Sequence, residues 1–346
     1  MENKSSAPSM FMQHMPCSAI ERFNLSLSNN IDMDSTTDSN DENIALSFII
    51  PTMNEEENIG RLIDSIHQHS KQIAHEVLVV DNGSTDKTRS IAEEKGAVVL
   101  LEPELKIAGL RNAGAAQSSG TIYIFLDGDV ELTEAWSQEF PATQQMLEQD
   151  RNIITGSKCS IANEDNFLEK YWFSSSQGES GNYINSGHLI IHKALFDKIN
   201  GFDPDLVTGE DTDLSIRAKT TQNARIINNQ KLKVLHHGYP NDLYTFVKRE
   251  AWHGTRTRKF FDVICCSNVQ FATNIFLILH ISLFFTIAMQ LTALTSVILI
   301  SIVLLLLASA LYKFGPKPKL VLINSLIFYF YFLGRSISIL KVLLKL

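Results

Sequence analysis

The sequence has few cysteines and too little positive charge for several classes of protein. Its 346 residues include 4 cysteines, and none of them shows the C-x-x-C spacing of a zinc or redox site. So few cysteines also exclude a disulfide scaffold and favour a reducing compartment. The formal net charge of −8 leaves no general basic surface for phosphate backbones, so we predict that the chain does not bind nucleic acid.

Charged side chains are missing altogether from one long stretch, because 263–312 contains no Asp, Glu, Lys or Arg. Each membrane span needs about 20 apolar residues, so this stretch is long enough for two. We predict a transmembrane hairpin here, with its turn near Gln290. A third apolar run, Leu320–Leu333, is shorter and is followed by Arg335. We expect 320–346 to associate with the membrane as a span, a re-entrant segment or an in-plane helix.

Basic residues flank the predicted hairpin on both sides and indicate its orientation. They are Lys248, Arg249, Arg256, Arg258, Lys259, Lys313, Lys317 and Lys319. Basic flanks stay on the cytoplasmic side, so both ends of the hairpin are predicted to be cytoplasmic. Since 1–43 also lacks the apolar core of a signal peptide, we predict an integral protein of the inner or plasma membrane whose large polar part is in the cytoplasm.

The polar part divides by composition into three regions. Residues 1–43 are rich in Ser, Asn and Asp and lack periodic apolar positions, which predicts a disordered tail. Residues 44–240 have the composition of one globular domain. Residues 241–262 are basic and contain aromatic side chains, which predicts an amphipathic juxtamembrane helix with Phe246 and Trp252 at the lipid interface.

Apolar, β-prone runs alternate with helical segments in the first half of the domain, and this alternation predicts an α/β fold with a parallel sheet. The expected strands are Leu46–Ile50, Glu76–Val80, Ala97–Leu101 and Ile122–Leu126, and the expected helices are Ile59–Gln68, Asp86–Glu94 and Ile107–Gln117. A helix near Glu134–Glu148 and a strand near Asn152–Lys158 are expected to follow. The polar loop 174–187 is of the kind that often forms acceptor sites.

Polar residues follow the predicted strands at the edge where open parallel sheets bind ligands. Asp127 and Asp129 come directly after the fourth strand, and Gly128 between them permits a close approach. Two carboxylates suit Mg²⁺ or Mn²⁺ bound to a diphosphate, although a solvated acidic turn has the same sequence. Similarly, Asp81 ends the second strand, where it either caps a turn or binds a nucleotide.

The order of these segments resembles the family 2 inverting glycosyltransferases, which have the GT-A fold. The matching segments are Pro51–Glu55 for P-x-Y-N-E, Asp81–Asp86 for D-D-G-S-x-D, Arg111–Gly114 for R-N-x-G, Asp127–Asp129 for D-x-D, and Glu210–Asp211 for E-D. The resemblance covers about Leu46–Trp252. Met53 and Asn82 depart from the family pattern, which affects base stacking and nucleotide preference rather than the metal or the base.

The resemblance implies a role for each matched residue. Pro51, Thr52, Glu55 and Asp81 would bind the nucleoside, Arg111 would lie near the nucleotide, and Asp127 and Asp129 would hold the metal and diphosphate. Asp211 would be the catalytic base, with Glu210 as the alternative, because inverting transfer needs a carboxylate that takes a proton from the acceptor hydroxyl. His237 is either a further metal ligand or an ordinary histidine.

The implied activity is transfer of one sugar from a nucleotide-diphospho-sugar to a lipid-linked or membrane-proximal glycan acceptor, as in polysaccharide biosynthesis at the cell surface. The Q-x-x-R-W sequence of processive synthases is absent, which favours single addition. A polyprenyl-phosphate sugar synthase, a nucleotidyltransferase and a catalytically silent membrane scaffold are the alternatives. A membrane anchor would raise the effective concentration of an acceptor that stays in the bilayer.

Overall fold

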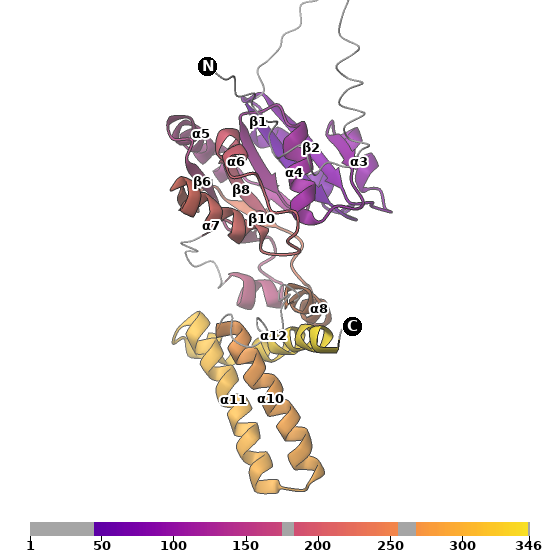
Figure 1. Ribbon diagram of the computed structural model, residues 1–346, viewed down its shortest axis with the longest axis vertical. Coiled ribbons are helices and arrows are strands. Elements are labelled where there is room, and N and C mark those ends of the chain that lie inside the picture. The colour runs from indigo at the N-terminus through magenta and orange to yellow at the C-terminus, as the bar shows by residue number, and fades with distance from the viewer. Residues whose placement is uncertain (1–44, 175–182, 255–267, 345–346) are drawn as a thin grey trace, which may run out of the picture. The chain divides into compact units, whose positions relative to one another are not determined.

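The structure is a computed structural model of the chain and describes residues 45–174, 183–254 and 268–344 (Figure 1). Three predicted features lie wholly or partly outside these residues: the tail at 1–43, the loop at 174–187 and the end of the juxtamembrane helix after Gly254.

A seven-stranded mixed sheet forms the centre of the domain, in the order β3-β2-β1-β4-β8-β6-β9. The strands are β1 (Leu46–Thr52), β2 (His75–Asp81), β3 (Val98–Leu101), β4 (Ile122–Leu126), β6 (Ile153–Gly156), β8 (His188–His192) and β9 (Arg225–Asn228). The first four strands are parallel to one another, which confirms the prediction for this half of the domain. β8 runs antiparallel to both β4 and β6, so the complete sheet is mixed.

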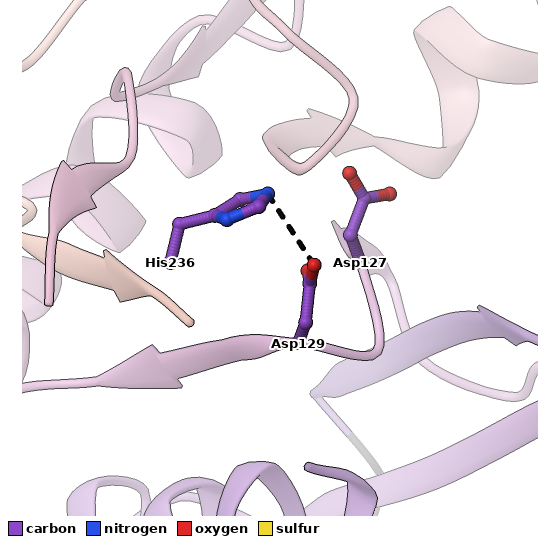
Figure 2. A group of neighbouring side chains, drawn as sticks. All are labelled: Asp127, Asp129 and His236. Carbon is purple, nitrogen blue, oxygen red and sulfur yellow. Dashed lines mark ion pairs between the residues drawn. The ribbon is translucent and has the colours of Figure 1, made fainter. Parts of the chain in front are cut away.

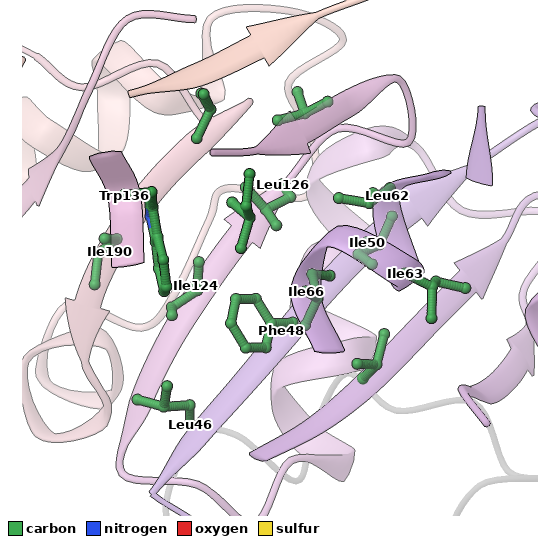
Figure 3. Close-up of a cluster of buried hydrophobic side chains, with 14 of the residues drawn as sticks. Leu46, Phe48, Ile50, Leu62, Ile63, Ile66, Ile124, Leu126, Trp136 and Ile190 are labelled. Atoms are coloured by element: carbon green, nitrogen blue, oxygen red, sulfur yellow. The ribbon is translucent and has the colours of Figure 1, made fainter. Parts of the chain in front are cut away.

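Helices cover both faces of the sheet because successive strand residues point to opposite faces. The helices are α2 (Ile59–His69), α3 (Thr88–Glu94), α4 (Ile107–Gln117), α5 (Glu134–Gln149), α6 (Lys193–Lys198) and α7 (Glu210–Gln222). In β1, Phe48 and Ile50 pack in the cluster formed with α2 and α5 (Figure 3). Ile49 packs in the opposite cluster, with residues of α4, α6 and α7. Burial on both faces explains why β1 has a continuous apolar sequence.

A small second sheet brings distant segments to the end of β4. It consists of β5 (Val130–Leu132), β10 (Val234–His236) and β7 (Ser160–Ile161), with β10 in the middle. β10 is antiparallel to β5, and His236 is the partner of Val130. This pairing places the histidines of the late sequence next to the D-x-D segment.

Three C-terminal helices are long and apolar enough to cross a membrane: α10 (Asn268–Ala288), α11 (Thr292–Phe314) and α12 (Pro318–Leu344). A turn at Gln290, whose φ is 55°, joins the first two as predicted. The third apolar segment is one continuous helix that includes Arg335.

The juxtamembrane helix α8 (Leu243–His253) packs against protein on one side. Phe246 is fully buried in an aromatic cluster with Trp172 and Phe173 of the short π-helix η2 (Glu169–Phe173). The prediction that Phe246 lies at the lipid interface is therefore wrong, because η2 and α12 supply apolar side chains that cover it. Trp252 is about half exposed.

Candidate functional site

A cavity with a volume of about 1220 Å³ lies where β1 and β4 end. Most of the site residues predicted from the sequence line it: Pro51, Thr52, Glu55, Arg111, Asp127, Asp129, Glu210 and Asp211. Segments that are far apart in the sequence thus meet in one place, as expected at the carboxyl edge of such a sheet. Two predicted site residues, Asp81 and His237, are not among the described residues that line the cavity.

Asp127, Asp129 and His236 form a group that could hold a metal ion (Figure 2). Each offers one ligand atom, and these atoms lie within 4.8 Å of one another. Asp129 Oδ1 and His236 Nδ1 are buried without a hydrogen-bond partner among the described residues. Since buried polar atoms are nearly always paired, a buried carboxylate oxygen without a partner beside a second carboxylate fits a divalent cation.

The charges in this group also fit a cation. Burial, and then the neighbouring Asp127, raise the pKa of Asp129 to about 7. Burial likewise raises the pKa of Glu55 to about 7, and the nearby carboxylates of Asp129 and Asp127 add to the effect. A divalent cation would offset this repulsion and keep the carboxylates ionised.

The histidine in the group is not the one that the sequence predicted. His237 Nε2 lies 2.7 Å from Glu131 Oε2, whereas His236 Nε2 lies 3.5 Å from Asp129 Oδ2. Neighbouring residues along an extended strand point to opposite sides, so only one of the two can face Asp129. His236 therefore replaces His237 in the candidate ligand set. The alternation of side chains along a strand could not show from the sequence which histidine faces Asp129, because either one was compatible with a strand at this position.

Asp81 orders a turn and does not reach the cavity. It is fully buried, and its Oδ1 accepts hydrogen bonds from the backbone N–H groups of Gly83 and Ser84 at 3.0 and 2.8 Å. Its Oδ2 accepts from the hydroxyl groups of Ser84 and Thr52. Asp81 thereby fixes Thr52 and the turn containing Asn82, both of which do line the cavity.

The glycine of the D-x-D segment makes room for the protein's own chain. A Cβ at position 128 would lie 3.0 Å from Glu55 Cγ and 3.2 Å from Thr52 Cγ2. A larger residue would therefore crowd the side chains of Glu55 and Thr52. Gly128 therefore allows these two parts of the site to lie side by side.

Arg111 links the two acidic parts of the cavity. Its guanidinium donates from Nη2 to Asp127 Oδ1 at 2.7 Å and from Nη1 to Glu210 Oε1 at 2.8 Å. The side chain is only 2% exposed. Because a planar guanidinium fixes the direction of both bonds, Arg111 sets the position of Glu210 relative to the candidate metal ligands.

The two candidate bases at the start of α7 differ in their partners. Gly209, whose φ is 78°, precedes the helix in a left-handed conformation that suits glycine. Glu210 Oε1 is bound by Arg111 and by the hydroxyl of Ser186. Asp211 lines the cavity, and burial and then the charge of Glu210 raise its pKa. Asp211 is thus the better proton acceptor of the two.

The comparisons with known proteins support the resemblance. Residues 47–196 match the family model for glycosyl transferase family 2. In this part, the chain is therefore similar to the family 2 glycosyltransferases. Glycosyltransferase AglE of Haloferax volcanii is 30% identical over 186 residues, which are 50% of this chain and 60% of that protein. An uncharacterized glycosyltransferase of Rickettsia typhi is 36% identical over 116 residues, or 34% of this chain and 38% of the other. The chain thus spans less than two thirds of these relatives.

A solved structure agrees in fold with the glycosyltransferase domain and its C-terminal helices. The mannosyltransferase PcManGT from Pyrobaculum calidifontis, solved in complex with GDP-Man and Mn²⁺, matches with a TM-score of 0.52. The match covers 94% of both chains at 16% identity. This supports the GT-A fold that the sequence predicted.

Several residues of the site were not marked by any motif. Asn185 lies inside the matched part, near the end of the predicted acceptor loop, and its Nδ2 donates to Asp211 Oδ2 at 3.3 Å. The far side of the cavity is lined by Trp252, Tyr331 and Arg335 of α8 and α12. No short motif marked these residues, since only the packing of the C-terminal helices brings them to the glycosyltransferase domain.

Proposed function

We propose that this chain is a metal-dependent inverting glycosyltransferase that moves one sugar from a nucleotide-diphospho-sugar to a lipid-linked or membrane-proximal acceptor. The observation that carries the proposal is the placement of two kinds of acidic group in one cavity. Asp127 and Asp129 stand with His236 in a possible metal group, and Asp211 stands separately at the start of α7. The family match to 47–196 supports the same reaction class.

Asp127, Asp129 and His236 would hold Mg²⁺ or Mn²⁺. Such an ion neutralises the charge that develops on a departing diphosphate. Thr52 and Glu55 would then contact the nucleoside, because they line the cavity beside Gly128. The positively charged Arg111 would hold Asp127 in the orientation that the diphosphate site requires.

Asp211 would act as the general base. Its carboxylate takes the proton of the acceptor hydroxyl while that oxygen attacks the anomeric carbon from the side opposite the diphosphate. The bond between the anomeric carbon and the diphosphate oxygen breaks, and the nucleoside diphosphate leaves with the bonding electrons. Asn185, which donates to Asp211, would orient the carboxylate for this step.

The membrane helices supply the setting for the reaction. Basic residues such as Lys248 and Lys317 lie at both ends of the predicted hairpin, so we place the domain at the cytoplasmic face of the inner or plasma membrane. An acceptor that remains in the bilayer would meet the cavity where α8 and α12 line it. Assembly of cell-surface glycans is the process that this arrangement suits.

The proposal is tested by incubating the full chain in lipid nanodiscs with a panel of nucleotide-sugars and membrane lipid extract, and by measuring the nucleoside diphosphate released. We expect release from one donor, abolished by EDTA and restored by Mn²⁺ or Mg²⁺. Release of pyrophosphate would instead indicate a nucleotidyltransferase. Failure of folded protein to bind any nucleotide would contradict the assignment of the donor site.

A further inference from the structure

The cavity is larger than one substrate needs and continues to the membrane helices. Ligand pockets commonly measure about 300–1,000 Å³, and this one reaches about 1220 Å³. One end contains the carboxylates of the proposed donor site. The other end is lined by Trp252 of α8, Val269 of α10, and Tyr331 and Arg335 of α12. The cavity therefore has room for a second subsite beside the apolar C-terminal helices.

An arginine at this position in α12 requires an explanation, because α12 is apolar enough to cross a membrane. Ionisable side chains in such helices are costly and usually mark a functional site. Arg335 Nη2 lies 3.1 Å from Glu250 Oε2, and its Nε is buried without a hydrogen-bond partner among the described residues. The guanidinium thus keeps donor capacity that Glu250 does not use.

Positive charge is in excess around Glu250. This carboxylate is only 5% exposed and also lies 3.5 Å from Arg249 Nη1. The charge of Lys313 also interacts with Glu250, and its Nζ lies 3.6 Å from the centre of the Trp172 ring. Glu250 therefore has three cations near it, of which only Arg335 is among the described residues that line the cavity. An anion at the second subsite would offset the charge of Arg335.

The second subsite is also open to apolar groups. Val269, in the first turn of α10, is 44% exposed and lines the cavity. Further along the same helix, Phe271 and Ile278 are more than half exposed, as expected of side chains that face lipid. A ligand with a charged head and an apolar tail could place its head at Arg335 and its tail along α10.

We propose that Arg335, held by Glu250, binds the phosphate group of an acceptor whose prenyl-like tail remains in the membrane. This inference rests on the proposed function and assigns the acceptor class to the same cavity. It covers both a lipid phosphate and a sugar carried on a lipid diphosphate, because the anionic group is the same. Charge-assisted bonds from guanidinium to phosphate oxygens provide the recognition.

The test measures binding to the full chain in detergent with four probes: farnesyl phosphate, farnesol, inorganic phosphate, and a nucleoside diphosphate with Mn²⁺. We expect farnesyl phosphate to bind at least about tenfold more tightly than farnesol or inorganic phosphate, and Arg335→Gln to remove this preference. Arg335→Lys keeps the charge next to Glu250 and should retain part of it. Lys341→Gln is the matched control, since Lys341 is an exposed cation on the same helix that does not line the cavity.

Each outcome decides the proposal. An unchanged preference in Arg335→Gln, or no preference in the wild type, would overturn it. Equal binding of inorganic phosphate and farnesyl phosphate is one such loss of preference, and it would overturn the assignment to a lipid acceptor because the apolar tail would add nothing to binding. Binding of the nucleoside diphosphate shows that each variant is folded. If the wild type bound farnesyl phosphate but no nucleotide, the proposed function would fail while the phosphate site remained.

Discussion

The guanidinium of Arg111 bonds to Asp127 at 2.7 Å and to Glu210 at 2.8 Å, and so joins the proposed donor site to the loop that presents the proposed base. Both contacts lie in the cavity, and Arg111 itself is almost fully buried. The two carboxylates share this one cation. A change at Arg111 should therefore affect folding and turnover together.

Arg111→Gln should lower the free energy of unfolding by about 3–5 kcal/mol, because it leaves the buried carboxylate of Glu210 without its cation. Thermal melting of the purified chain in detergent measures the effect. Arg225→Gln is the matched control, since Arg225 forms an exposed ion pair with Asp150 at 2.9 Å. Its loss should cost less than about 1 kcal/mol. Equal destabilisation by the two substitutions would contradict the role given to Arg111.

The two adjacent histidines provide a direct comparison for the metal group. His236→Gln should lower the affinity for Mn²⁺ in the presence of nucleotide by about 10- to 100-fold, the range seen when a metal site is perturbed. His237→Gln should change it by no more than about twofold, because His237 pairs with Glu131 instead. A calorimetric titration of Mn²⁺ at fixed nucleoside diphosphate gives both values. A larger effect at His237 would restore the original sequence prediction.

The pH dependence of turnover should report Asp211. Burial and the charge of Glu210 raise its pKa above the ordinary value of about 3.9. The base must be deprotonated, so kcat/KM for the acceptor should rise with pH through a midpoint above that value and then level off. Glu210→Gln removes the neighbouring charge and should shift the midpoint to lower pH. A midpoint that stays in place or rises in this variant would argue against Asp211 as the titrating group.

Close packing between α8 and α12 should be needed for acceptor binding. A Cβ at position 334 would lie 2.7 Å from Val247 O and 2.9 Å from Glu250 Cβ. Gly334→Ala should therefore separate the helices, lower stability by about 1–3 kcal/mol and raise the KM for a lipid acceptor. Gly109→Ala, in α4, is the control, because its nearest contact would be Leu105 Cβ at 3.3 Å, without the backbone contact that position 334 would meet. If Gly334→Ala behaved like this control, the two helices would not be coupled in this way.

The sequence was sufficient to predict the parallel half of the sheet, because β1 and β4 are short apolar runs that end at polar residues. It also indicated the carboxylates of the site, since Asp127 and Asp211 belong to segments whose order resembles one family. These features depend on local sequence. The antiparallel strand β8 was not predicted, because its apolar sequence is equally suited to either direction.

The sequence could not distinguish features that depend on packing between distant segments. Whether His236 or His237 faces Asp129 depends on how β10 pairs with β5. Burial of Phe246 depends on η2 and α12, which are far from it along the chain. The contribution of Arg335 to the cavity likewise follows from the docking of α12 on α8. In each case the residue type was visible in the sequence, but its neighbours were not.

Donor binding and turnover by Asp129→Ala and Asp211→Asn, compared side by side in nanodiscs, test the central claim most directly. We predict that Asp129→Ala loses Mn²⁺-dependent binding of the nucleotide-sugar. Asp211→Asn should keep donor affinity within about twofold but lose about 10²- to 10⁴-fold in turnover, the usual contribution of a general base. Near-normal turnover by Asp211→Asn, or undiminished metal-dependent donor binding by Asp129→Ala, would contradict the account.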